Sequence, residues 1–202
     1  MKELILPLAL TAVLASLLFP IPTAILDILL VGNLLLAAML VASSIYITDA
    51  LKLSSLPAIL LLATLARLSL NVATTRLILG SGDAGQTVEA FGSVVISENL
   101  VVGLIVFIVI TLIQFLVIAK GAERVAEVAA RFTLDALPGR QMSIDADVRA
   151  GVIDFDTARK RRADLQTESR FYGALDGAMK FIKGDAIAGI AIVIVNIMGG
   201  LA

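Results

Sequence analysis

Long apolar runs separated by short polar stretches dominate this chain. Five runs carry little or no charge, at residues 4–19, 21–47, 56–79, 100–119 and 187–202. A helix needs about 20 apolar residues to cross the hydrocarbon core, so the second and third runs are long enough to span it with some tilt. The first run is short, and the fifth stops where the chain stops. This pattern predicts an all-α membrane protein built as a multi-span helical bundle.

The composition supports this class. Hydrophobic residues make up 59% of the chain, charged residues 16%, and the mean hydropathy is +0.99, values typical of an integral membrane protein.

The first run could also be a secretory signal peptide, but Glu3 and the absence of an A-x-A cleavage site favour a membrane helix. Pro20 and Pro22 predict a tight turn between the first two spans.

Several chemistries are disfavoured by the residues that are missing. The 202 residues include no Cys and no His, which removes thiol catalysis, disulfides and the commonest metal ligand and general base. No phosphate-binding Gly-rich loop occurs, and the acidic spacing at Asp145 and Asp147 lacks the closing glutamate of a calcium loop. We therefore expect no enzymatic activity, no cofactor, no bound metal and no nucleic-acid partner.

The distribution of charge predicts an orientation in the membrane. Residues 80–99 contain three acidic residues and no Lys or Arg, whereas residues 120–183 contain twelve Lys or Arg against ten Asp or Glu. Because cytoplasmic loops carry the excess of Lys and Arg, we expect residues 120–183 and the N-terminus in the cytoplasm and residues 80–99 outside. The predicted organisation is four spans in residues 1–119, a small α-helical insert at 120–183, and the start of a fifth span at 184–202 of a longer protein.

The insert itself has a pattern of two helices. Charged and small apolar residues alternate over residues 120–132, which predicts a helix that continues the fourth span. The Leu-Pro-Gly-Arg sequence at 137–140 predicts a turn, and a second helix is expected to begin near Asp154 or Asp156 as cap. The basic cluster at 159–162 fits an ordinary solvated helix face better than a site for anionic lipid headgroups.

The third apolar run is unusual because it carries two arginines. At about 100° per residue, Arg67, Asn71 and Thr74 share one helix face, while Ser69 and Arg76 lie nearly opposite. Charged groups persist within membrane helices where they face protein or water, so two polar faces imply two neighbours. The uncharged residues could simply join helices by hydrogen bonds, whereas the arginines could pair with carboxylates of adjacent helices.

Two carboxylates lie near the predicted membrane boundaries. Asp27 is close to the start of the second span, where it could stabilise its own helix dipole or pair with an arginine. Asp185 directly precedes the last apolar run, as an N-cap would. Held between Lys180, Lys183 and a low-dielectric interior, Asp185 could alternatively take up and release a proton.

Three segments resemble one known family. Residues 67–79 (Arg-Leu-Ser-Leu-Asn-Val-Ala-Thr-Thr-Arg-Leu-Ile-Leu), 120–147 and 176–189 are similar, in this order, to the FHIPEP export-gate family of type III secretion. The resemblance implies a bacterial inner-membrane subunit with about eight spans and a large cytoplasmic C-terminal domain that this chain lacks. It also implies assembly as a ring of nine copies that couples proton entry to the export of unfolded proteins.

The resemblance also implies particular residues and partners. The positions expected in proton or ion coupling are Asp185, Lys180, Asp27, Arg67 and Arg76, and those of a charged cytoplasmic motif are Arg124, Arg131 and Asp135. The implied partners are further copies of the chain, other membrane proteins of the export apparatus, membrane lipids, and substrates and chaperones that bind the missing domain. The motifs favour the injectisome branch over the flagellar branch; a small-solute secondary transporter and a purely structural ring are the alternatives.

Overall fold

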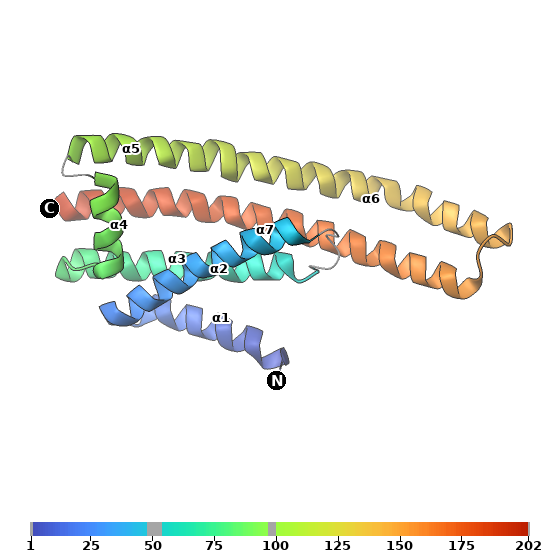
Figure 1. Ribbon diagram of the computed structural model, residues 1–202, viewed down its shortest axis with the longest axis horizontal. Coiled ribbons are helices and arrows are strands. Elements are labelled where there is room, and N and C mark those ends of the chain that lie inside the picture. Colours follow the sequence, from blue (N-terminus) through green and yellow to red (C-terminus); the bar gives the residue numbers. More distant parts are fainter. Residues whose placement is uncertain (1, 48–53, 97–99, 202) are drawn as a thin grey trace.

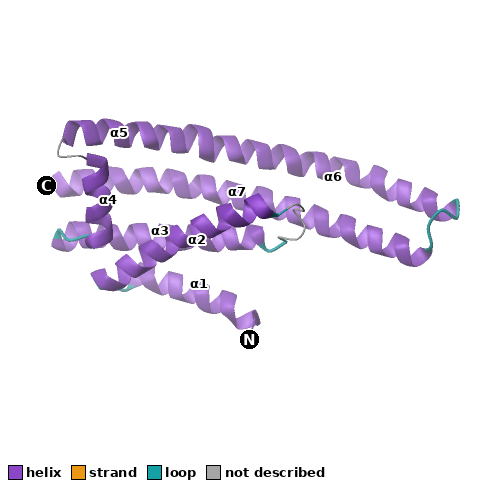
Figure 2. Cartoon of the chain, in the orientation of Figure 1, coloured by secondary structure: helices purple, strands orange, loops and turns teal. Residues whose placement is uncertain are grey.

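The computed structural model describes residues 2–47, 54–96 and 100–201, and every regular element in these ranges is helical (Figures 1 and 2). In chain order the elements are α1 (Lys2–Leu18), α2 (Thr23–Tyr46), α3 (Leu56–Ser81), α4 (Gln86–Ile96), α5 (Leu100–Ile113), the π-helical segment η2 (Gln114–Ala119), α6 (Lys120–Arg149) and α7 (Phe155–Leu201). The predicted all-helical class is confirmed.

Four of the helices are long and apolar enough to cross a membrane. They are α2, α3, α7 and the continuous helix formed by α5, η2 and α6. The shorter helix α1 has 17 residues. Helix α3 is at the centre of the bundle, because it packs against α1, α2 and α7. Its polar side chains therefore have protein on more than one side.

Helix α7 is too long to lie wholly within a membrane. Its 47 residues extend for about 70 Å at 1.5 Å per residue, against a hydrocarbon core of about 30 Å. The charged half of α7 packs along α6, and the two extend beyond the other helices (Figure 1). We call α6, the turn at 150–154 and residues 155–183 of α7 the helical hairpin. The remaining described residues form the membrane half.

The continuity of α7 corrects one prediction. Asp185 was expected as the N-cap of the last span, but it lies in the middle of an unbroken helix. The apolar run begins there, yet the helix begins 30 residues earlier. A change from polar to apolar composition marks where a helix enters an apolar environment, and it does not require a new helix.

The predicted turn at 137–140 is also wrong. Helix α6 runs through Pro138 to Arg149. Proline inside a helix removes one backbone hydrogen bond and is normally unfavourable. Here Leu137 and Val148 pack against the buried cluster of Ile144, Ala158 and Leu165 that joins α6 to α7. Packing on both sides of Pro138 keeps the chain helical, because tertiary contacts outweigh local propensity.

The tip of the hairpin turns at Gly151, whose φ of 69° favours glycine. The side chain of Asp154 then accepts a hydrogen bond from the amide of Thr157 at 3.0 Å, and α7 begins at Phe155. The predicted helix start at Asp154 is confirmed. The hydrogen bonds from Thr157 lower the pKa of the Asp154 carboxyl below its usual value.

Ion pairs link the two helices of the hairpin along their length. Arg140 lies 2.9 Å from Glu168, Arg161 lies 3.3 Å from Asp147, Lys183 lies 2.7 Å from Glu123, and Arg162 contacts Asp145. Exposed pairs of this kind contribute little stability individually. Their positions, together with the buried cluster, fix which residues of α6 face which residues of α7.

We predict that Ile144→Ala destabilises the helical hairpin by about 2 kcal/mol, the lower end of the range for a buried aliphatic residue cut to alanine. Ile144 is 7% exposed and belongs to the only cluster of buried residues that joins α6 to α7 in the described chain. Hydrogen exchange of the hairpin amides measures the effect. Met142→Ala is the control, because Met142 is 69% exposed on the same helix. Equal protection in the two variants would contradict the assigned core.

The cap at Asp154 predicts a dependence on pH. Because its folded pKa is lowered, the carboxylate stabilises the start of α7 above its unfolded pKa, and this contribution disappears as the pH falls through the folded value. Exchange of the amides at the tip, corrected for intrinsic rates, should therefore accelerate in acid. Asp154→Asn keeps a capping oxygen without a titrating group, so the extra acceleration should be absent. An identical pH response in both proteins would refute the assignment.

Candidate functional site

One polar face of α3 binds α1. Ser69 is 1% exposed, and its hydroxyl donates a hydrogen bond to the carbonyl of Val13 at 3.1 Å and contacts the hydroxyl of Ser16. Without these contacts the hydroxyl of Ser69 would be an unpaired polar group in an apolar environment. The prediction that Ser69 and Arg76 share a neighbour opposite to Arg67 is confirmed.

Arg76 caps the end of α1. Its guanidinium donates to the carbonyl of Leu17 at 2.8 Å and to that of Leu18 at 3.3 Å. The last carbonyls of a helix have no partner within the helix and carry the negative end of its dipole, so a cation there is doubly favourable. The expected pairing of Arg76 with a carboxylate is wrong in the described chain; its partners are the carbonyls at the end of a helix.

Asp27 caps the opposite kind of helix end, the start of α4. Its two carboxylate oxygens accept hydrogen bonds from the backbone amides of Thr87 at 2.9 Å and Gln86 at 3.1 Å. A carboxylate is favourable at the positive end of a helix. Neither interpretation of Asp27 from the sequence fits this arrangement: Asp27 lies beyond the first turn of α2, and its partners among the described residues are backbone amides of α4 and not an arginine. It caps a different helix, 59 residues away in the chain.

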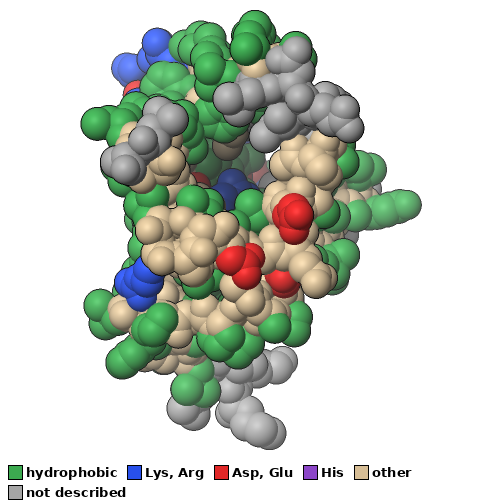
Figure 3. Space-filling view, turned by 90° about the vertical axis from the view of Figure 1, so that its left-hand side faces the viewer, with side chains coloured by type: hydrophobic (Ala, Val, Ile, Leu, Met, Phe, Trp, Pro, Cys, Tyr) green, Lys and Arg blue, Asp and Glu red, His purple; other side chains and the backbone are tan. Residues whose placement is uncertain are grey.

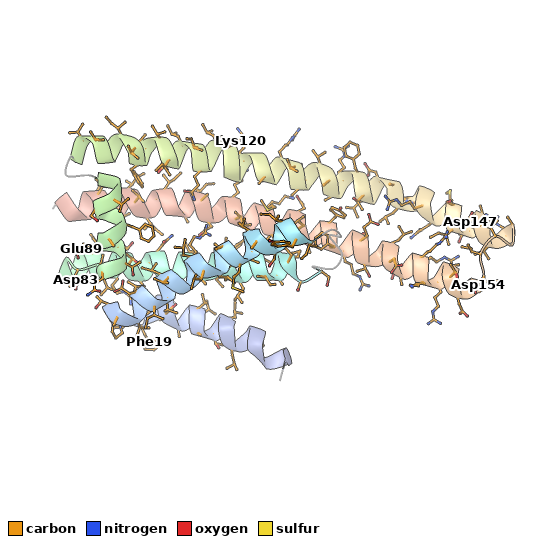
Figure 4. The ribbon with its side chains drawn as sticks, in the orientation of Figure 1. Phe19, Asp83, Glu89, Lys120, Asp147 and Asp154 are labelled. Atoms are coloured by element: carbon orange, nitrogen blue, oxygen red, sulfur yellow. The ribbon has the colours of Figure 1, made fainter. Side chains whose placement is uncertain are left out.

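Gly85 explains why this cap comes from another helix. It directly precedes α4, where a capping side chain would normally be found, and it has none. Its φ is 88°, and a Cβ atom there would lie 2.7 Å from Oδ1 of Asp27. The amide of Gly85 donates to the carboxylate of Asp83 at 2.9 Å. Figure 4 shows Asp83 and Glu89 at this end of the molecule.

The other polar face of α3 lines a cavity of about 240 Å³. Helices α3, α5 and α7 and segment η2 surround it. Seven of its lining side chains are polar, although it lies among apolar helices: Arg67, Asn71, Thr74, Thr111, Gln114, Asp185 and Asn196. We call this space the polar cavity. It brings together Arg67 and Asp185, two of the residues expected in proton coupling.

Arg67 of α3 and Asp185 of α7 both line the polar cavity, so two opposite charges share this space. They are not joined by an ion pair at contact distance among the described residues, and Oδ1 of Asp185 is buried there without a hydrogen-bond donor. A carboxylate that shares a cavity among apolar helices with a single guanidinium and several uncharged polar groups has a protonation state that depends strongly on small changes around it. The cavity is therefore suited to a change of charge.

Lys180 does not belong to this cavity. Its ammonium group binds the carboxylate of Asp176 at 2.8 Å. Five residues separate Lys180 from Asp185, which places them about 140° apart around the helix. Lys183 in turn binds Glu123 of α6 at 2.7 Å. The expectation that Asp185 is held between lysines is wrong, because both lysines bind other carboxylates; the cation that lines the polar cavity with Asp185 is Arg67.

The charged motif on α6 lies away from the polar cavity. Arg124 pairs with Glu127 at 3.6 Å and Arg131 with Asp135 at 3.7 Å, and all four side chains are more than half exposed. None of them lines either cavity of the described chain. The structure therefore separates the predicted site residues into three places: the polar cavity, the capped helix ends and the surface of the hairpin.

A larger cavity of about 870 Å³ adjoins the polar cavity. Its walls come from α2, α3, α4, α5 and α7 and are mostly apolar, and Arg67 and Asn71 line both cavities. Figure 3 looks at the end of the molecule that carries α4 and shows a hollow with a basic side chain below its rim. Among its lining residues, Arg67 alone carries a charge. We call this space the outer cavity.

Three lining residues of the polar cavity were missed in the sequence: Thr111, Gln114 and Asn196. Each is a single uncharged polar residue within an apolar run, so it lacks the charge that marked the predicted site residues. Gln114 also begins η2, and π-helical turns are rare and frequent at functional sites. The described residues contain no cluster of three or more metal-ligating side chains.

These features define a helical membrane protein with a charged cavity between its spans, and the chain belongs to the FHIPEP family, whose model matches residues 13–202. It is 54% identical to low calcium response locus protein D of Yersinia pestis and to secretion system apparatus protein SsaV of Salmonella typhimurium, over 99% of this chain. It is 57% identical to hypersensitivity response secretion protein HrcV of Ralstonia nicotianae over 94% of the chain. The chain spans 28–29% of the length of these curated relatives. No solved structure matches it significantly.

We predict that Gly85→Ala destabilises the attachment of α4 by about 1–3 kcal/mol, because the new Cβ atom requires both an unfavourable φ and displacement of the Asp27 carboxylate. Hydrogen exchange of the α4 amides measures the loss. Gly92→Ala is the matched control within α4, since its Cβ would meet nothing within 4 Å and alanine favours the helix by about 0.5–1 kcal/mol. A Gly85→Ala protein with unchanged exchange would disprove the cap.

Proposed function

We propose that this chain is the membrane portion of an inner-membrane export-gate subunit of a type III secretion system, which couples proton entry to the export of unfolded proteins. Membership of the FHIPEP family supports the assignment. Two relatives are named as a secretion system apparatus protein and a hypersensitivity response secretion protein, which favours the injectisome branch over the flagellar branch.

The main support for this proposal is that Arg67 and Asp185 line one cavity inside the membrane half. A charged residue at the centre of a membrane helix costs about 2.5–3.5 kcal/mol on insertion scales. The other arginine of α3 has a structural use, because Arg76 caps α1. Arg67 has no hydrogen bond or ion pair of its own to the described residues, so its interaction with Asp185 accounts best for its presence.

In the proposed mechanism Asp185 is the proton acceptor. As a carboxylate it is attracted to Arg67 on α3, and protonation removes that attraction. Since α7 is one continuous helix from the membrane half to the tip of the hairpin, a small shift of α7 against α3 moves the hairpin as well. Protonation thus biases an element with two arrangements, and the hairpin transmits the change to the rest of the apparatus.

The remaining site residues receive other roles. Asp27 and Arg76 hold the ends of α4 and α1, so they support the coupling site without carrying the proton. Lys183 joins α7 to α6 at the base of the hairpin, and Lys180 pairs with Asp176 within α7. The exposed Arg124, Arg131 and Asp135 on α6 are placed to contact neighbouring copies in a ring of nine or other cytoplasmic partners.

The proposed topology places the N-terminus and the hairpin in the cytoplasm and α4 outside. The excess of Lys and Arg in residues 120–183 supports this orientation. The outward faces of α2 and α5 carry exposed apolar side chains, such as Ile28 and Ile105, which suit contact with lipid or neighbouring membrane subunits. Substrates and chaperones are assigned to the part of the longer protein beyond this chain.

We predict that Asp185→Asn in the full-length protein abolishes secretion while membrane assembly continues. The substitution keeps the size of the side chain but cannot bind and release a proton. Secreted substrate and assembled complex are measured in the same cells. Asp164→Asn is the matched control: Asp164 is an exposed carboxylate on the same helix, outside both cavities, and this variant should secrete normally.

Secretion at the normal level by assembled Asp185→Asn protein would remove Asp185 from the mechanism. An equal loss in the Asp164→Asn control would show that secretion responds to charge anywhere on α7, and it would contradict the specific role of the polar cavity.

A further inference from the structure

Asn196 lies on the same side of α7 as Asp185. Eleven residues separate the two, which is about three helical turns and places their side chains on one stripe, roughly 16 Å apart along the axis. Both line the polar cavity. Asn196 is the last polar side chain of α7 that faces this cavity, and the part of the cavity at Asn196 is the part nearer the α4 end of the bundle.

Both residues present a buried oxygen without a partner. Oδ1 of Asp185 and Oδ1 of Asn196 are shielded from the surface and have no hydrogen-bond donor among the described residues. Buried acceptors in native proteins are nearly always hydrogen-bonded, to protein or to ordered water. Two such oxygens on one helix stripe, in a space with polar walls, point to water as the missing donor.

The polar cavity has the size and the lining for several water molecules. Its volume of about 240 Å³ corresponds to about eight waters at roughly 30 Å³ each. Thr74, Thr111 and Gln114 add polar groups from α3, α5 and η2, so the cavity offers hydrogen-bonding groups on more than one helix. An apolar cavity of this size would stay dry, whereas one with converging polar groups holds water.

The polar cavity continues into the outer cavity. Arg67, Asn71, Phe107 and Val193 line both spaces, and the outer cavity reaches α4 through Thr87, Val88, Phe91 and Gly92. Asn196 belongs to the polar cavity and Ile197 to the outer one. The position of Asn196 is therefore where the two spaces meet along α7.

We propose that the polar cavity is a water-binding site and that Asn196 is a positioning residue, which orders the water between the outer cavity and Asp185. The water site rests on the cavity and its unpartnered oxygens alone. The role of Asn196 in delivering a proton rests in addition on the proposed function of Asp185. The amide neither gains nor loses a proton; it accepts and donates hydrogen bonds that hold water in line.

The first test measures water at this position without any assay of secretion. The chain contains no Cys, so Asn196→Cys and Ile194→Cys introduce single thiols, with any cysteine elsewhere in the full-length protein replaced. A small, charged methanethiosulfonate reagent reacts with thiols in contact with water. We expect the thiol at 196 to react at least tenfold faster than that at 194. Ile194 is 52% exposed and lines neither cavity, so in a membrane we expect it to face lipid and not water. Equal rates would overturn the water site.

The second test separates positioning from packing. Asn196→Leu fills a similar volume but cannot hydrogen-bond, and Asn196→Ser restores a polar group with room for one more water. In the full-length protein we expect Asn196→Leu to lower secretion at least tenfold with assembly intact and Asn196→Ser to retain most of it. Normal secretion by Asn196→Leu, or an equal loss in both variants, would overturn the positioning role.

The two proposals fail in different ways. A reactive thiol at 196 combined with normal secretion by Asp185→Asn would refute the proton-coupling role of Asp185 and support the water site. An unreactive thiol at 196 combined with loss of secretion in Asp185→Asn would refute the water site and leave the proposed function in place.

Discussion

Polar groups inside a membrane must find their partners within the protein, because no bulk water is present to bind them. The packing of this bundle follows from that constraint. Helix α1 is held to α3 by Ser69 and by the guanidinium of Arg76, which binds the last carbonyls of α1. Helix α4 is held to α2 by the carboxylate of Asp27. In both cases the charge matches the end of the helix dipole that it caps, so backbone groups left unpaired at two helix ends bind a side chain of a neighbouring helix.

The same constraint isolates the candidate site. Once Arg76 and Asp27 are assigned to helix ends, Arg67 of α3 and Asp185 of α7 are the two charged residues that line the polar cavity. Oδ1 of Asp185 has no hydrogen-bond donor among the described residues, whereas Arg76 and Asp27 each make two hydrogen bonds to backbone groups. A change of protonation has the largest effect on a charge that is incompletely paired. Because α7 carries Asp185 and also one side of the helical hairpin, a local change of charge has a rigid connection to a surface outside the membrane.

Much of this arrangement follows from the sequence. The period of 3.6 residues separates the two polar faces of α3, and the capping chemistry of Asp154 marks the start of α7, because both depend on residues near in the chain. The partners of Asp27 could not be obtained in this way. Asp27 binds amides 59 and 60 residues away, and no pattern of neighbouring residues predicts that pairing. Gly85 indicates a close approach of Asp27 only when the structure is known. The helix through Pro138 depends on packing between α6 and α7, which outweighs the local preference that suggested a turn. The continuity of α7 at Asp185 was not predicted, because a change from polar to apolar composition resembles a helix start although it does not require one.

In the proposed mechanism Asp185 changes its protonation inside the membrane half while the rest of the bundle stays folded. Infrared difference spectroscopy of the full-length protein in membranes, recorded as the pH is varied, observes the carbonyl stretch of a protonated carboxylic acid directly. We expect a protonated-carboxyl band that appears on acidification, is absent in Asp185→Asn, and is shifted in Arg67→Gln. A spectrum in which Asp185→Asn leaves every pH-dependent carboxyl band unchanged would contradict it.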